Sequence, residues 1–76
     1  MYNGKILING IESARAFVAL TAGYPKLRIM LNSHEYTVDA HSIIGILSLD
    51  LSQPIDICAE GENVDEFADK LKPFTV

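Results

Sequence analysis

The feature that most limits the fold is the change between two hydrophobic periods along a chain of only 76 residues. In four short stretches apolar and polar residues alternate, which is the pattern of a strand with one buried face. Such strands form an antiparallel or mixed sheet that packs helices against its apolar face and leaves the other face to water. The expected strands cover residues 5–8, 26–31, 35–40 and 55–59, with a turn at 32–35 between the middle two.

Between these stretches apolar residues recur every three or four positions, as they do along one face of a helix. The first predicted helix covers residues 11–22 and ends at Gly23. The second covers 43–49 after the N-cap Ser42, although Gly45 inside it costs roughly 1 kcal/mol relative to alanine. The third lies in the closing segment GENVDEFADKLKPF, residues 61–74, with Asn63 and Glu66 as its predicted cap and Pro73 as its stop. The apolar stripes expected to face inward consist of Ile11, Ala14, Phe17, Val18, Thr21 and Ala22 in the first helix and Val64, Phe67, Ala68 and Leu71 in the third.

The expected element order is therefore β-α-β-β-α-β-α, an open-faced two-layer α+β sandwich, formed by residues 1–76 as a single domain. A single cysteine, Cys58, cannot form an internal disulfide, and this favours a reducing compartment. No apolar run approaches the roughly 18 residues of a membrane helix. We expect a soluble cytoplasmic protein.

Charge and residue types limit the function. The formal net charge is −4 and the six basic residues are scattered, whereas nucleic-acid binding depends on clustered Lys and Arg. The spacing of His, Cys, Asp and Glu predicts no metal site, and no nucleophile stands beside a base as catalysis requires. We expect a protein without a cofactor that is not an independent enzyme.

The segment YTVDAHSIIGILSLDLSQPIDICAEG, residues 36–61, resembles the HPr phosphocarrier family of the bacterial phosphoenolpyruvate:sugar phosphotransferase system. Weaker similarity extends over nearly the whole chain. The resemblance implies the HPr-like sandwich, with a mainly antiparallel four-stranded sheet and three helices on one face, and makes residues 43–49 the second helix. The matching residues are Val38, Ala40, Ser42, Ile43, Gly45, Leu47, Ser48, Leu49, Ile55, Ile57, Ala59, Glu60 and Gly61.

The family carries its phosphoryl group on a histidine in a Gly-Leu/Ile-His-Ala-Arg-Pro-Ala motif at the start of the first helix. Aligning the arginine with Arg15 puts Ser13 at the histidine, and a gapless alignment puts Ile11 there. Neither placement supplies a histidine. The resemblance thus implies a divergent member in which Ile11, Glu12, Ser13 and Arg15 form a degenerate motif region that cannot carry phosphohistidine.

Two other features of the family are retained in the second helix. In many members a kinase phosphorylates the serine that matches Ser42, and a phosphate at a helix N-terminus is stabilised by the dipole. A plain N-cap also explains Ser42. The family docks partners through exposed apolar residues here, which implies Ile43, Ile44 and Leu47. The implied partners are proteins, namely enzyme I, permease components, an HPr-type kinase or a transcription regulator, and neither nucleic acid nor a membrane.

The sequence leaves two alternatives to this regulatory or protein-interaction module. One is a functional phosphocarrier with an unconventional acceptor, for which His41, Glu12 and His34 are the candidates. The other is a small-ligand-binding module built on the same fold, because fold alone does not fix function.

Overall fold

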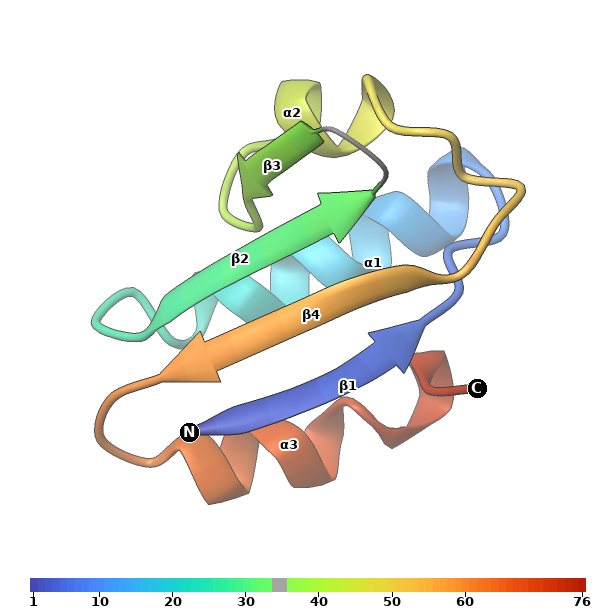
Figure 1. Ribbon diagram of the computed structural model, residues 1–76. Helices are drawn as coiled ribbons and strands as arrows, with labels where there is room; N and C mark the ends of the chain where they lie inside the picture. The colour runs from blue at the N-terminus through green and yellow to red at the C-terminus, as the bar shows by residue number, and fades with distance from the viewer. Residues whose placement is uncertain (34–35) are drawn as a thin grey trace.

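A computed structural model describes residues 1–33 and 36–76, and over these the predicted element order is confirmed. Four strands form one antiparallel sheet in the order β1-β4-β2-β3 (Figure 1). Helices α1 and α3 cover one face of the sheet, and α2 packs on α1 and β3. The elements are β1 (Tyr2–Ile6), α1 (Ile11–Ala22), β2 (Arg28–Ser33), β3 (Tyr36–Asp39), α2 (Ile43–Leu47), β4 (Ile55–Glu60), α3 (Val64–Lys70) and a 3₁₀ turn (Lys72–Phe74).

The core lies between the sheet and the two long helices. Alternation along the strands puts their apolar side chains on the helix-covered face, as the sequence pattern predicted. Phe17 from α1 and Phe67 from α3 are both fully buried against this face. The largest buried side chains are Phe17, Phe67, Ile6, Ile8, Ile29, Leu31, Ile46, Ile55, Ile57 and Leu71.

Gly45, the residue with low helix propensity in the second predicted helix, packs closely against its neighbours. A Cβ added at this position would lie 3.2 Å from Val38 Cβ and 3.4 Å from Ser42 Oγ. A methyl group at this point would contact Val38 tightly, so the Val38 side chain or the helix would have to shift by a few tenths of an ångström. The glycine therefore allows a close approach of α2 to β3.

Several predicted boundaries are wrong for physical reasons. The strand predicted over 5–8 is β1, which begins at Tyr2 and ends at Ile6, where its partner β4 begins at Ile55. Part of the predicted turn over 32–35 belongs to β2, because Asn32 pairs with Thr37 on one side and with Asp56 on the other. The remaining two residues of that turn, 34 and 35, lie outside the described residues. The second helix is also shorter than predicted, since α2 ends at Leu47.

Some predictions for individual helix residues are confirmed and others are wrong. Ile11 and Ala22, expected to face inward, are the first and last residues of α1 and are exposed. Gly23 does cap α1, and its N–H bonds to the carbonyls of the last turn. Asn63 holds the N-cap position of α3 but has a left-handed φ of 64° and makes no side-chain capping bond.

Candidate functional site

Helix α1 begins without a side-chain cap. Gly10 occupies the N-cap position with a φ of 89°, a conformation that a residue without Cβ adopts readily. Its carbonyl oxygen accepts a bond from the Ala14 N–H at 3.1 Å, and no side chain among the described residues caps the first turn. Glu12, in this turn, places a negative charge at the positive end of the helix dipole. The start of α1 is therefore a helix end with unpaired N–H groups and one carboxylate.

The other predicted residues of the motif region do not gather there. Glu12 and Arg15 are exposed and Ser13 is half-buried. Across residues 1–33 and 36–76, the structure gives these three side chains no hydrogen bond and no ion pair. The segment contains no imidazole, so its nucleophilic groups are a carboxylate and a hydroxyl.

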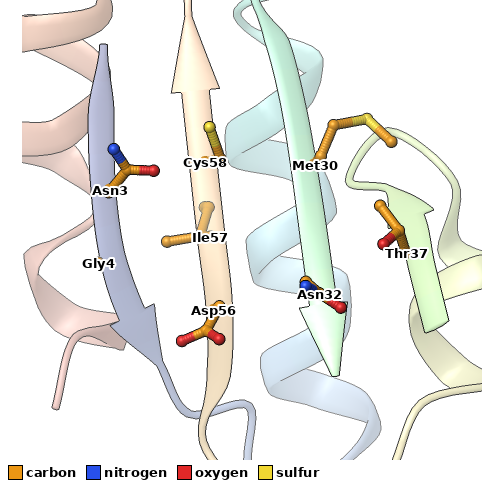
Figure 2. Close-up of a pocket in the computed structure, with 8 residues that line it drawn as sticks. All are labelled: Asn3, Gly4, Met30, Asn32, Thr37, Asp56, Ile57 and Cys58. Atoms are coloured by element: carbon orange, nitrogen blue, oxygen red, sulfur yellow. The ribbon is translucent and has the colours of Figure 1, made fainter. Parts of the chain in front are cut away.

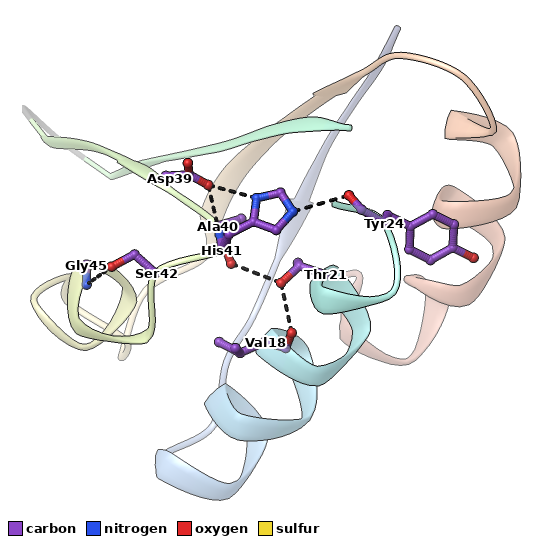
Figure 3. Close-up of polar contacts among 8 residues, drawn as sticks. All are labelled: Val18, Thr21, Tyr24, Asp39, Ala40, His41, Ser42 and Gly45. Carbon is purple, nitrogen blue, oxygen red and sulfur yellow. Dashed lines mark hydrogen bonds and ion pairs between the residues drawn. The ribbon is translucent and has the colours of Figure 1, made fainter. Parts of the chain in front are cut away.

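Helix α2, by contrast, begins with a formed cap. Ser42 has an extended backbone, and its Oγ accepts a bond from the Gly45 N–H at 3.1 Å (Figure 3). The cap predicted from the sequence is confirmed. Because Ser42 is exposed, its hydroxyl is accessible from solvent while it caps the helix.

The residues just before Ser42 are tied to the end of α1. The His41 N–H donates to Asp39 Oδ1 at 2.8 Å, and His41 Nδ1 lies 2.9 Å from the same oxygen. On the other side of the ring, His41 Nε2 lies 3.2 Å from the carbonyl oxygen of Tyr24 (Figure 3). The backbone N–H and the ring of His41 together lower the pKa of the Asp39 carboxyl below its usual value. Sequence patterning did not predict this bridge, because its ends lie 17 residues apart.

A second contact supports the same junction. The hydroxyl of Thr21 is buried and lies 2.9 Å from the Val18 carbonyl oxygen and 3.2 Å from the Ala40 carbonyl oxygen. The Ser42 N–H also donates to the Asp39 carbonyl oxygen at 3.0 Å. The segment between β3 and α2 is therefore fixed by backbone and side-chain bonds.

The predicted docking residues differ in exposure. Ile44 is 81% exposed and Leu47 is 43% exposed, whereas Ile43 is half-buried. Their neighbour Ile46 is fully buried and is the residue that anchors α2. Ile11, expected in the core, is instead 53% exposed at the start of α1, the helix on which α2 packs. Figure 1 shows that the start of α1 and the end of α2 lie toward the same end of the molecule.

A shallow hollow of about 400 Å³ lies on the open face of the sheet, and none of the predicted site residues lines it (Figure 2). The Asp56 carboxylate, the charged group in its lining, is 3.5 Å from Lys5 Nζ. The lining residues are Asn3, Gly4, Met30, Asn32, Thr37, Asp56, Ile57 and Cys58.

Of the other acceptors considered, His34 lies outside the described residues. Within the described ranges no group of three His, Cys, Asp or Glu side chains is placed to hold a metal ion. Nor does this part of the chain contain a helix both long and apolar enough to cross a bilayer.

Comparison with known proteins gives a consistent picture. A family model described as the PTS HPr component phosphorylation site matches residues 11–75. The structure is similar to the crystal structure of HPr-C-His from Thermoanaerobacter tengcongensis, with a TM-score of 0.82 and 28% identity over 96% of this chain and 89% of that one. It is also similar in fold to a phosphocarrier protein HPr from Bacillus anthracis str. Ames, with a TM-score of 0.75 and 24% identity over 99% and 96% of the two chains. No sequence among the curated proteins matches.

Proposed function

The chain belongs to the HPr family of the phosphotransferase system, and from this premise we propose that it acts as a regulatory or protein-interaction module rather than as a carrier of phosphohistidine. HPr proteins are phosphocarriers and not catalytic enzymes, and they interact with proteins of that system such as enzyme I and permeases. Enzyme I, permease components, an HPr-type kinase or a transcription regulator in the cytoplasm are the partners proposed for this chain.

The proposal rests on which residues stand at the start of α1, the helix where the family motif lies. This segment offers Glu12 and Ser13 but no imidazole. Phosphohistidine is a phosphoramidate that passes its phosphoryl group onward, whereas a phosphate on Ser13 is a stable ester. A phosphate held at this position stays on the protein.

His41 is a poor substitute acceptor because of its contacts. Attack on phosphorus needs a ring nitrogen with a free lone pair, and in His41 both nitrogens face oxygen acceptors, from Asp39 and Tyr24. Glu12 is exposed and could form an acyl phosphate, but no cation lies against it among the described residues to stabilise the added charge.

Incubation with enzyme I and labelled phosphoenolpyruvate tests this part of the proposal. We expect no acid-labile phosphate on the chain under conditions that phosphorylate a histidine-bearing HPr completely. Variants His41→Gln, His34→Gln and Glu12→Gln identify the acceptor if label appears. Histidine-type phosphate that one of the first two variants abolishes would overturn the proposal, and label lost only in Glu12→Gln would favour the unconventional carrier.

Ser42 is the proposed regulatory site. Its Oγ is exposed and lies at the start of α2, where a phosphate gains favourable interaction with the helix dipole and the first N–H groups, typically 0.3–1 kcal/mol. Phosphorylation also adds close to two negative charges at the start of the helix that carries the exposed side chains of Ile44 and Leu47. Modification at this point changes the charge of the surface on which a partner is expected to dock.

An HPr-type kinase with ATP provides the test. We expect one phosphate per chain, lost in Ser42→Ala and retained in Ser48→Ala, which alters an exposed serine at the other end of the same helix. Phosphate that persists in Ser42→Ala would contradict the assignment.

The exposed apolar side chains of Ile44, Leu47 and Ile11 are proposed as the docking surface, with half-buried Ile43 at its edge. A few well-packed side chains near the centre of an interface contribute most of its affinity. Ile44→Ala and Leu47→Ala should therefore weaken binding to enzyme I or the kinase, measured by calorimetry, and Val76→Ala, at an exposed apolar residue of the C-terminus, should not. Unchanged affinity in both helix variants would exclude this surface.

A further inference from the structure

His41 occupies an unusual position between two hydrogen-bond acceptors. Its Nδ1 lies 2.9 Å from Asp39 Oδ1, and its Nε2 lies 3.2 Å from the Tyr24 carbonyl oxygen. The ring joins the β3–α2 junction, residues 39–42, to the loop that follows α1 (Figure 3). The side chain of His41 is 28% exposed, so the bridge is partly shielded from water.

The two contacts together select one protonation state. A carbonyl oxygen only accepts, and the lowered pKa of Asp39 keeps its carboxylate ionised and accepting at neutral pH. A neutral imidazole has one N–H, so in either tautomer a ring lone pair faces one of these oxygens. Only the imidazolium donates from both nitrogens and satisfies both contacts.

The end of α1 provides a second reason for a cation at this point. The last turn of α1 contains no basic residue, and the Tyr24 carbonyl lies just beyond the Gly23 cap. The C-terminal end of a helix carries partial negative charge and favours a nearby cation. His41 is 17 positions away in the sequence from the residue it contacts, so the tertiary fold brings its ring to this end of the helix.

Two other charged side chains have contacts with the residues of the bridge in the described part of the chain. Asp39 faces the ring from the β3 side. From α3, Lys70 lies with its Nζ 5.7 Å from the centroid of the Tyr24 ring, and Figure 3 shows that ring directed away from His41. No carboxylate besides Asp39 makes an ion pair with His41 in these residues.

We propose that His41 is a protonation-dependent clamp, which as an imidazolium fastens the β3–α2 junction carrying Ser42 to the C-terminal end of α1. When His41 loses a proton, one of its two ring contacts is lost and the junction is held by the remaining one and by the Thr21 hydroxyl. The contacts of the clamp are present with Ser42 unmodified, so the proposal does not require Ser42 to be phosphorylated.

Nitrogen-15 NMR of the imidazole rings tests the protonation state directly, with His34→Gln used to assign the signals. At about pH 7.5 an ordinary histidine is mostly neutral. We expect the ratio of protonated to neutral His41 to be severalfold higher in the parent chain than in Asp39→Asn. Equal ratios in the two proteins would overturn the proposal.

The pH dependence of unfolding gives an independent readout. The parent chain should be more stable than His41→Gln at about pH 5.5, and this difference should shrink as the pH rises through the histidine range. His41→Lys, which keeps a cation throughout that range, should show no such loss. A difference between the parent and His41→Gln that stays constant from about pH 5.5 to 9 would contradict a clamp that depends on protonation.

The test does not involve enzyme I or a kinase, so its failure is distinguishable from failure of the proposed function. If His41→Gln does not fold, the NMR comparison and His41→Lys still decide the question. A histidine ring that is neutral at about pH 5.5 in the parent chain would overturn the proposal by itself.

Discussion

The starts of α1 and α2 are two helix N-termini of one small protein, and they are constructed in opposite ways. α1 begins at Gly10 with no side-chain cap, and its polar residues Glu12 and Arg15 extend into solvent without a partner among the described residues. α2 begins at Ser42 with a side-chain cap, directly after the bridge formed by Asp39 and His41.

The difference shows where each helix obtains its stability. α1 has 12 residues and buries Phe17 and Ala14, so packing holds it without a cap. α2 has five residues and buries only Ile46, so local bonds must hold its first turn. The start of the short helix α2 is therefore held by a side-chain hydrogen bond, whereas the start of the long helix α1 has none among the described residues.

The largest expected effect tests the anchor of α2. Ile46→Ala should lower the free energy of unfolding by about 2–5 kcal/mol, because a fully buried side chain is removed and a cavity is left. Ile44→Ala, at an 81% exposed position on the same helix, should change it by less than about 0.5 kcal/mol. Urea denaturation measures both, and equal losses would mean that α2 is packed differently.

The next prediction compares a serine from each helix start. Ser42→Ala should destabilise the protein by about 1 kcal/mol and speed hydrogen exchange of the Gly45 amide, because the cap bond is lost. Ser13→Ala, which removes no hydrogen bond of the described structure, should cost less than about 0.5 kcal/mol. If both variants lose the same stability, the two helix starts do not differ as described.

Asp39→Asn tests the bridge through its pH dependence. The folded-state pKa of Asp39 is lowered by its bonds to His41, so its contribution to stability is present above the unfolded value of about 3.9 and disappears as the pH falls through the folded one. At neutral pH we expect a loss of at most about 1 kcal/mol, since the carboxylate is exposed. The parent and variant curves should converge in acid, and parallel curves would refute this account.

The smallest effects are expected at the start of α1. Glu12→Gln and Arg15→Ala should each change the free energy of unfolding by less than about 0.5 kcal/mol, because both side chains are exposed and unpaired in the described structure. Thermal unfolding at low salt, where charge effects are strongest, is the stringent measurement. A loss above 1 kcal/mol for Arg15→Ala would reveal an interaction that the structure lacks.

The order of elements could be predicted from the sequence because it depends on local periodicity. Alternation of residue types shows which face of a strand is apolar. It predicted that Ile29 and Leu31 face the core and Arg28 faces solvent, before any neighbouring strand was known. Boundaries were less predictable. Asn32 reads as a turn residue from its type, yet it lies in β2 because strands on both sides pair with it.

In the candidate site, too, features that depend on neighbouring residues were predictable and features that depend on tertiary packing were not. The Ser42 cap follows from a serine at the start of an apolar helix and was predictable. The exposure of Ile11 was not, because periodicity places it on the inward stripe while its position at the very end of α1 leaves it uncovered. His41 was considered as a phosphate acceptor, but no pattern pointed to its contact with Tyr24, which precedes it by 17 residues.

The sequence alone determined the order and amphipathic faces of the elements, the absence of a histidine between Asn9 and Arg15, and the capping role of Ser42. All of these depend on residue type and short spacing. The tertiary structure decided which apolar residues stay exposed and which acceptors the His41 ring meets. Such contacts join residues far apart in the chain, and their geometry exists only once the sheet and helices have packed.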